Sequence, residues 1–167
     1  MLLYIALNIF LFVFDKRKSN FTVQSFEKTL IYVSAFLILI TACAGAFTSK
    51  YGASLACANW PYCNSSLYPN INDQFEVIHF IHRVLAFFLV LILAFLIYRL
   101  RKYYKYFSLS NKIVFNLIPT IIFFQISLGA MLIVFEVPIW MGVFHQFMGL
   151  LLFSSLSILI FSVKVKN

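Results

Sequence analysis

Charged residues are scarce in this sequence. Asp, Glu, Lys and Arg make up only 11% of its 167 residues, whereas 63% are hydrophobic and the mean hydropathy is +0.95. A soluble domain of this size needs much more polar surface, so the composition excludes a soluble protein and predicts an integral membrane protein. Membrane lipid is therefore an expected partner, and the 21 Phe and 9 Tyr suit a lipid-facing surface with aromatic belts.

The N-terminus lacks both the length of a membrane span and a cleavage site. Residues 1–14 are apolar, but a spanning helix needs about 20 apolar residues. Basic residues follow this run instead of preceding it, and no small-residue cleavage site appears. We interpret the run as an interfacial or partly inserted helix, or as the remnant of a misplaced start codon. Residues 1–28 then form an N-terminal apolar and basic segment, and 29–167 form the membrane domain.

Four later stretches are long and apolar enough to cross the membrane. They cover residues 30–47, 76–98, 113–135 and 141–163. Between the first two lies a polar loop, 48–75, which contains Gly, Pro and Asn turns and two cysteines. Pro119, near the start of the third stretch, is a candidate kink. The predicted fold class is all-α, an integral membrane four-helix bundle.

The basic residues give this bundle an orientation. Of the 13 Lys and Arg, all except Lys50 and Arg83 fall on one side under the four-span topology. The positive-inside rule places that side in the cytoplasm and the cysteine loop outside. We therefore expect a multi-pass protein of the cell membrane. The net charge of +8 is explained by this topology, so nucleic acid is not an expected partner.

Two histidines lie at matched depth in two spans that run in the same direction. His82 and His145 each lie about six residues inside a span, which is roughly 9 Å below the outer boundary. Ionisable groups at such a depth are costly and usually functional. Equal depth predicts a pair of axial ligands to the iron of one haem in the bundle core. The alternative is that each histidine hydrogen-bonds across helices in a packed bundle.

Three more polar residues share the segment around His82. His79 lies one turn above His82 on nearly the same face. It could serve as a second ligand, an acid/base group or a hydrogen-bond partner. Arg83 suits either a clamp on an anionic group such as a haem propionate or snorkelling to the interface. Glu76 could pair with Arg83 or a histidine, or stabilise the helix start. Zinc ranks low, because no tight cluster of three or four ligands lies within the membrane.

The remaining cysteines and polar residues have simpler interpretations. Cys57 and Cys63 lie in the outer loop, where a disulfide is favoured over free thiols or a metal site. This loop precedes the second span directly and could cover the His82–His145 site. Cys43 is expected to be a buried apolar residue of the first span. The other intramembrane polar and small residues suit helix–helix contacts: Gln125, Gln146, Gly129, Gly142 and Gly149.

Several of these residues together resemble the haem A synthase family. The run from Gly45 to Cys63, with Gly-Ala-Ser-Leu at 52–55 and Trp-Pro at 60–61, is similar to that family's outer loop. The sequence Ile-His-Arg-Val-Leu-Ala at 81–86, Gln-Ile-Ser-Leu-Gly at 125–129 and His-Gln at 145–146 also fit, and the resemblance covers residues 30–160. Full-length members resemble two four-helix halves fused in one chain, so the implied fold is one half of an eight-helix haem A synthase.

The resemblance also implies an activity and roles for residues. It implies an oxidoreductase that oxidises the C8 methyl of haem O, its substrate, to the formyl of haem A, with haem b as prosthetic group. His82 and His145 would then be the axial pair on the haem iron, with Arg83 as a further haem-binding residue. The family often shows Glu-x-x-His-Arg, but here His79 takes the glutamate's place and Glu76 lies one turn earlier. His79 and Glu76 are therefore the candidate catalytic residues.

The resemblance further implies partners, and it leaves a rival function open. A single half predicts a homodimer, and haem O synthase and cytochrome oxidase assembly proteins are candidate partners. The rival is a bis-histidine haem-binding membrane protein for electron transfer or haem handling, without synthase activity. A third interpretation is a small structural subunit with no cofactor.

Overall fold

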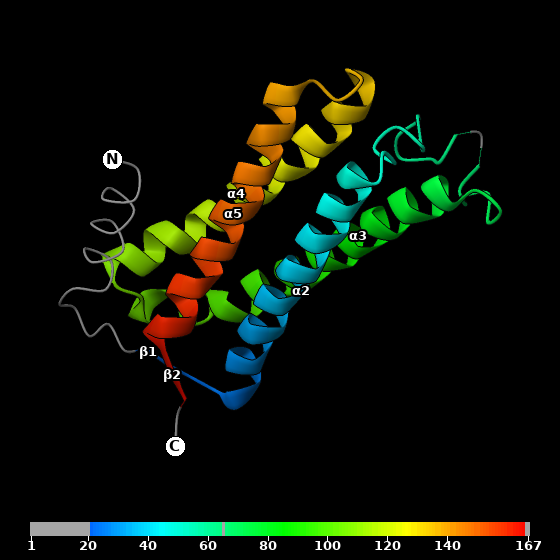
Figure 1. Ribbon diagram of the computed structural model, residues 1–167. Coiled ribbons are helices and arrows are strands. Elements are labelled where there is room, and N and C mark those ends of the chain that lie inside the picture. Colours follow the sequence, from blue (N-terminus) through cyan, green and yellow to red (C-terminus); the bar gives the residue numbers. More distant parts are fainter. Residues whose placement is uncertain (1–20, 65, 166–167) are drawn as a thin grey trace.

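Four long helices make up most of the computed structural model, which describes residues 21–64 and 66–165 (Figure 1). All four are long and apolar enough to cross a membrane, which confirms the predicted all-α membrane fold. The expectations for residues 1–14 and for the basic run at 16–18 lie outside the described residues. The helices are α2 (Ser25–Lys50), α3 (Gln74–Arg101), α4 (Leu109–Val134) and α5 (Ile139–Ser162).

The helices begin a few residues before the apolar stretches, and side-chain caps mark the starts of α3 and α4. The Asp73 side chain accepts hydrogen bonds from the backbone N–H groups of Phe75 and Glu76 at the start of α3. Ser108 accepts from the N–H of Asn111 at the start of α4, and Pro138 precedes α5. Such caps satisfy the backbone donors that a helix start leaves unpaired.

Two short strands join the ends of the described chain, which the sequence did not predict. Strand β1 (Phe21–Val23) pairs in parallel with β2 (Val163–Val165), and Phe21 lies opposite Val163. Phe21, Val23 and Val163 are buried, so this ladder is part of the apolar core. The ladder ties the start of α2 to the end of α5 (Figure 1). One turn of 3₁₀ helix, η1 (Tyr104–Tyr106), lies in the connection between α3 and α4.

The bundle has two distinct ends. We call the end with the strands the basic end, because Lys and Arg cluster around the α3–α4 connection there. We call the opposite end, with residues 51–73, the loop end. The helices pack as two pairs, α2 with α3 and α4 with α5, and α5 also packs against α2 (Figure 1).

Buried apolar side chains gather in the half of the bundle next to the basic end. Beyond Ile38 at the middle of α2, the buried side chains in the loop-end halves of the four helices are Thr41, Thr48, His79 and Met141. The core at the basic end is made by Ile31, Ala35, Ile38, Leu89, Leu93, Leu96, Leu100, Phe115, Ile118, Ile121, Leu152, Leu156 and Leu159.

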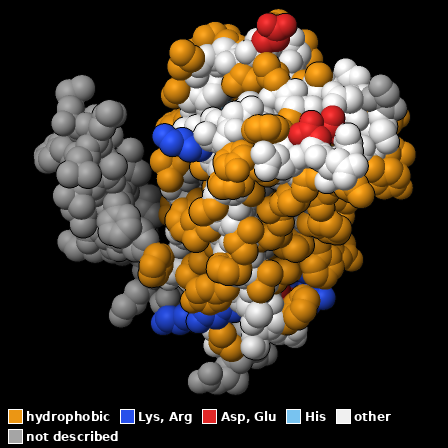
Figure 2. All heavy atoms as spheres, turned by 45° about the vertical axis from the view of Figure 1, so that its right-hand side comes forward, with side chains coloured by type: hydrophobic (Ala, Val, Ile, Leu, Met, Phe, Trp, Pro, Cys, Tyr) orange, Lys and Arg blue, Asp and Glu red, His pale blue; other side chains and the backbone are white. Residues whose placement is uncertain are grey.

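Apolar side chains also cover the outside of the helices. Figure 2 shows a broad hydrophobic band with Lys and Arg gathered at its lower edge. Large side chains such as Phe36, Phe87 and Phe123 are more than half exposed within the chain, as expected of a surface in contact with lipid. Cys43 lies on this outer surface as an exposed free cysteine, so its expected burial is wrong. The apolar pattern of the first span did not reveal which face of α2 packs inward.

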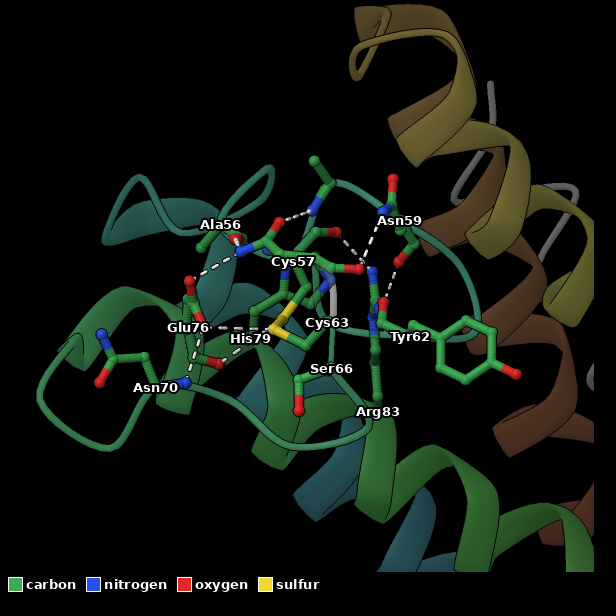
Figure 3. The surroundings of a disulfide bond; sticks show 12 residues. Ala56, Cys57, Asn59, Tyr62, Cys63, Ser66, Asn70, Glu76, His79 and Arg83 are labelled. Carbon is green, nitrogen blue, oxygen red and sulfur yellow. Dashed lines mark hydrogen bonds between the residues drawn. A yellow bond between two sulfur atoms is a disulfide. The ribbon is translucent and has the colours of Figure 1, made fainter.

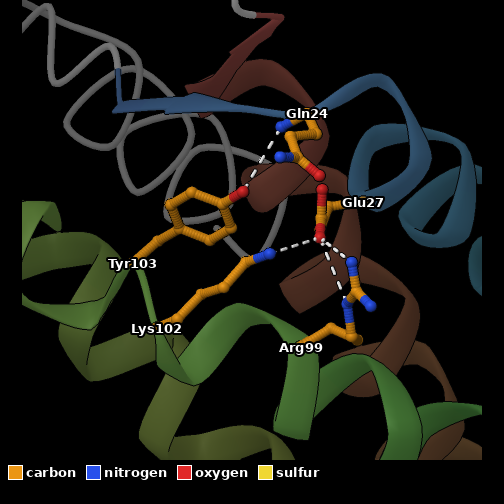
Figure 4. A network of polar contacts seen from close by, with 5 residues as sticks. All are labelled: Gln24, Glu27, Arg99, Lys102 and Tyr103. Carbon is orange, nitrogen blue, oxygen red and sulfur yellow. Dashed lines mark hydrogen bonds and ion pairs between the residues drawn. The ribbon is translucent and has the colours of Figure 1, made fainter.

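A buried carboxylate links α2 to the end of α3 at the basic end (Figure 4). Glu27 is 0% exposed, and its Oε1 accepts hydrogen bonds from Arg99 Nε at 3.2 Å and Lys102 Nζ at 2.8 Å. The hydrogen bond from Lys102 to Glu27 raises the pKa of Lys102 above its usual value. The two cations explain how a carboxylate in the first turn of α2 can be fully buried.

Glu27→Gln is expected to lower the free energy of unfolding by about 1–3 kcal/mol. The variant keeps the shape of the side chain but removes the only charge that pairs with Arg99 and Lys102 among the described residues. Breaking a fully buried pair costs more, about 3–5 kcal/mol, but both cations here can reach solvent. SDS-induced unfolding in mixed micelles, followed by circular dichroism, measures the change. Glu136→Gln in the exposed α4–α5 turn is the control, and equal stability of the two variants would refute the expectation.

Candidate functional site

His82 lies on α3 with its ring against the backbone of α2. A Cβ atom added at Gly45 would lie 2.8 Å from His82 Cε1, so the ring nearly touches the α2 main chain. The ring's Nδ1 is buried and has no hydrogen-bond partner among the described residues. His82 therefore carries a ring nitrogen that packing has removed from water without pairing it.

His145 lies on α5 in an equivalent setting against α4. Its Nε2 is 3.3 Å from Nε2 of Gln125, and its Nδ1 is buried without a partner in the described part of the chain. With the Gln125 amide donating to Nε2, a neutral His145 carries its proton on Nδ1. Gln125 thus joins α4 to α5, in agreement with its predicted role in helix–helix contact. Gly129 lies against this ring as Gly45 lies against His82.

The two histidines lie on diagonal helices of the bundle. α3 belongs to the α2–α3 pair and α5 to the α4–α5 pair, and both rings are in the loop-end half. The structure therefore places the two residues that the sequence singled out by their matched depth at the same end of the bundle.

The donor atoms of this pair fit a haem better than a free metal ion. The described residues contain no group of three or more His, Cys, Asp or Glu side chains placed to hold a metal ion. A haem iron needs only two axial ligands from the protein, because the porphyrin supplies the other four. His82 and His145 each offer one imidazole, and in His145 the ligating nitrogen would be Nε2, because Nδ1 carries the proton. Ligation through Nε2 of His145 requires Gln125 to release that nitrogen.

Arg83, the neighbour of His82, holds the loop that covers this end of α3 (Figure 3). Its Nη2 donates to the carbonyl oxygen of Cys57 at 2.7 Å, and its Nη1 donates to those of Asn59 and Tyr62 at 2.9 and 2.8 Å. Three carbonyl groups from one loop therefore converge on one guanidinium. The structure shows this role for Arg83, whereas the expected clamp on a haem propionate stays a prediction.

A disulfide closes the same loop. Cys57 and Cys63 are joined, as predicted from the sequence, and both are buried. The loop that they close contains Asn59 and Tyr62, whose carbonyl groups Arg83 binds. The disulfide and Arg83 thus fix the same loop, one through a covalent bond and the other through hydrogen bonds.

We expect Cys57 and Cys63 to resist alkylation in unreduced protein while Cys43 reacts. Cys43 is free and exposed, although detergent or lipid can slow its reaction. Intact mass after alkylation should show one blocked thiol without reductant and three with it, because only the reductant opens the Cys57–Cys63 bond. Cys43→Ser is the control and should show no blocked thiol without reductant and two with it. Free alkylation of Cys57 in unreduced protein from an oxidising compartment would contradict the disulfide.

His79 and Glu76, the candidate catalytic residues, both contact the loop as well (Figure 3). His79 is buried, and its Nδ1 lies 3.0 Å from the carbonyl oxygen of Ala53 and 3.4 Å from the N–H of Cys57. Glu76 accepts hydrogen bonds from the Asn64 side chain at 2.7 Å and the Asn70 N–H at 2.8 Å. Glu76 therefore pairs with neither Arg83 nor a histidine among the described residues, and its acid/base role stays a prediction.

Sequence reasoning missed Asn64, which links the loop to α3. Asn64 has a φ of +55°, which Asn tolerates better than most residues, and its side chain also donates to the carbonyl oxygen of Ala56 at 3.1 Å. An Asn one residue after a disulfide cysteine is a turn signal, but its bond to Glu76 depends on the folded loop. Gly45 was part of the recognised loop motif, yet nothing in the sequence showed its contact with His82.

Fold and site together define a multi-pass membrane protein with a disulfide-closed loop at the end of the bundle that holds a histidine pair. The chain belongs to the COX15-CtaA family of cytochrome oxidase assembly proteins, whose family model matches residues 1–157. This match confirms the resemblance found in the sequence.

Curated relatives of the chain are haem A synthases. The protein of Flavobacterium psychrophilum is 24% identical over 141 residues, which cover 77% of this chain and 41% of the relative. That of Bacillus pumilus is 30% identical over 79% of the chain and 43% of its own length. That of Pelagibacter ubique is 26% identical over 95% of the chain and 49% of its own length. The chain thus spans less than half the length of these relatives. No solved structure gives a significant match.

Proposed function

We propose that this protein is a haem A synthase-like oxidoreductase, which oxidises the C8 methyl of haem O to the formyl of haem A with haem b as prosthetic group. The observation that carries the proposal is the His82–His145 pair, with its buried and unpartnered ring nitrogens, in a chain of this family. The haem A synthases among its relatives support the same reaction.

In this proposal each part of the site has a task. His82 and His145 hold the haem iron, and the bound haem supplies the redox chemistry. The disulfide loop, held by Arg83, covers the loop end and limits the access of water. His79 and Glu76 are the titratable groups between the loop and the histidine pair, and they are the candidates to accept or deliver protons. A proton on His79 Nδ1 would be donated in a hydrogen bond to the carbonyl oxygen of Ala53.

The orientation of the bundle belongs to the same proposal. The basic end faces the cytoplasm and the disulfide loop lies outside. This arrangement is supported by the basic residues around the α3–α4 connection, because such residues favour the cytoplasmic side. At the loop end the described Lys and Arg are Lys50 and Arg83, and Arg83 is bound to loop carbonyl groups. The Cys57–Cys63 disulfide also suits an oxidising compartment.

We place the active unit in a homodimer. The reaction involves two haems, one held and one converted, whereas one copy offers one His82–His145 pair. The relatives are longer and offer room for a second four-helix unit, since the chain covers 41% to 49% of them. Twofold pairing is the commonest route to a second site. The wider partners of this unit would be haem O synthase and cytochrome oxidase assembly proteins.

The decisive experiment is haem extraction from cells that express this chain together with a source of haem O. The proposal expects haem A in the extract and expects none from cells with the His82→Ala variant. Native mass spectrometry of the purified protein in mild detergent should show an even-numbered oligomer with up to two haems per pair of chains. A monomer that forms haem A alone would refute the dimer.

The rival function is a bis-histidine haem protein for electron transfer or haem handling. It is favoured by one observation, the engagement of His79 and Glu76 with the loop, which leaves neither of them obviously free for proton transfer. This rival expects a low-spin haem in the purified protein and no haem A in the extract. A colourless protein under all conditions would instead favour a structural subunit.

A further inference from the structure

Each ring of the histidine pair lies directly against a glycine of the neighbouring helix. A Cβ atom at Gly45 on α2 would lie 2.8 Å from Cε1, 3.3 Å from Nδ1 and 3.4 Å from Nε2 of His82. A Cβ atom at Gly129 on α4 would lie 3.3 Å from Cε1 and 3.8 Å from Nδ1 of His145. The same edge of both rings, the one around Cε1, therefore faces bare backbone.

The other glycines of the bundle do not share this feature. Among the described residues, a Cβ atom at Gly142 would meet nothing within 4 Å, and one at Gly149 would meet only Nε2 of Gln125, at 3.5 Å. Glycine weakens a helix by roughly 1 kcal/mol relative to alanine in soluble hosts. A glycine inside a helix therefore calls for an explanation from packing. At Gly45 the reason is steric, because real Cβ atoms essentially never lie as close as 2.8 Å to another heavy atom.

We infer that Gly45 and Gly129 are positioning residues for the histidine pair, because each lets a histidine ring rest on the backbone of the neighbouring helix. Backbone in a helix is stiff, whereas a side chain could change rotamer. The distance between paired helices therefore sets how far each ring reaches into the bundle. This inference rests on the proposed haem-binding role for its purpose, but the ring contacts can be tested without haem.

The first test compares Gly45→Ala and Gly129→Ala with the control Gly142→Ala. Haem-free protein in detergent is treated with diethyl pyrocarbonate, and the labelling rate of each histidine is read by peptide mass spectrometry. We expect His82 to be labelled several-fold faster in Gly45→Ala than in the wild type. The added methyl group displaces the His82 ring, which in the wild type packs against α2. Gly129→Ala should do the same for His145 to a smaller extent, because its contact is looser. Gly142→Ala should change neither rate.

His79 serves as an internal reference, because its ring contacts the loop instead of either glycine. Its rate should be unchanged in all three variants. Unchanged labelling of His82 in Gly45→Ala and of His145 in Gly129→Ala would overturn the inference. Equal acceleration at all three histidines would overturn it too, because that pattern reports general loosening. Circular dichroism and gel filtration check the folding of each variant. If Gly45→Ala does not fold, Gly129→Ala, whose contact is looser, still tests the inference.

The second test uses protein loaded with haem b and records absorption and electron paramagnetic resonance spectra. We expect Gly45→Ala to lose part or all of the low-spin signal and Gly142→Ala to keep it. A wild-type low-spin signal in Gly45→Ala would overturn the positioning role. If the wild-type protein binds no haem while labelling shifts as expected, the proposed function fails and the ring contacts stand. The two tests therefore separate the two failures.

Discussion

Replacement of His82 or His145 by alanine should abolish the low-spin spectrum of the haem-loaded protein. A haem iron with two imidazole ligands is low-spin, and loss of one ligand leaves a five-coordinate, high-spin iron. Loss of even a second-shell partner weakens metal binding about 10- to 100-fold, so loss of a direct ligand should weaken haem binding by about tenfold or more. Spectra of the reduced and oxidised protein, together with haem content per chain, measure both effects.

The matched control for this prediction is His79→Ala. His79 lies one turn from His82 on the same helix, and its Nδ1 is held by the loop at Ala53. This variant should keep the low-spin spectrum, even if it loses activity. The ligand assignment would be wrong if both His82→Ala and His145→Ala kept wild-type haem content and spin state.

Replacement of Arg83 by methionine should release the disulfide loop from α3. Methionine keeps the length and apolar character of the side chain but removes three hydrogen bonds from a charged donor to loop carbonyl groups. Such bonds contribute about 1.5–3 kcal/mol each, and partial exposure of Arg83 reduces the sum to roughly 2–4 kcal/mol of local stability. Amide hydrogen exchange in residues 56–64 should accelerate by about thirtyfold or more, as such a loss implies.

Lys50→Met is the control for Arg83→Met. Lys50 ends α2 at the same end of the bundle, and its side chain is exposed. Exchange in the loop should not change in this variant. If Arg83→Met lowered haem affinity but left loop exchange at the wild-type rate, the clamp on a haem propionate would be its main role and the loop contacts would be incidental.

The sequence predicted the helices well, because lipid imposes length and apolarity on any spanning segment. Their ends were less predictable, since α2 begins at Ser25 within a polar stretch. The first turn of α2 buries Glu27, which finds its partners Arg99 and Lys102 only after folding. The strands β1 and β2 were missed for a similar reason, because three residues are too few for a pattern and their pairing spans the whole described chain.

The candidate site was predictable as far as depth along a helix could show it. His82 and His145 stood out because both are ionisable and equally deep, and the disulfide followed from spacing and position. Partners across the loop were not predictable. Glu76 binds Asn64, and Arg83 binds carbonyl groups, which every residue carries and no sequence pattern distinguishes. The prediction that Cys43 is buried was also wrong, because lipid-facing and core-facing positions of such a helix are equally apolar.

The parallel ladder between β1 and β2 gives the chain a cyclic order. Following the backbone from α2 to α5 and across the strand pair returns to the start of α2, so each helix has a neighbour on both sides along this cycle. Because the two strands are parallel, a circular permutant needs a crossover linker of about a dozen residues from residue 165 back to residue 21. With such a linker, and with new termini in the exposed α4–α5 turn, the permutant should insert its helices in the same arrangement. In that permutant the Cys57–Cys63 loop and both histidines stay within unbroken stretches, and only the order of the helices along the chain changes.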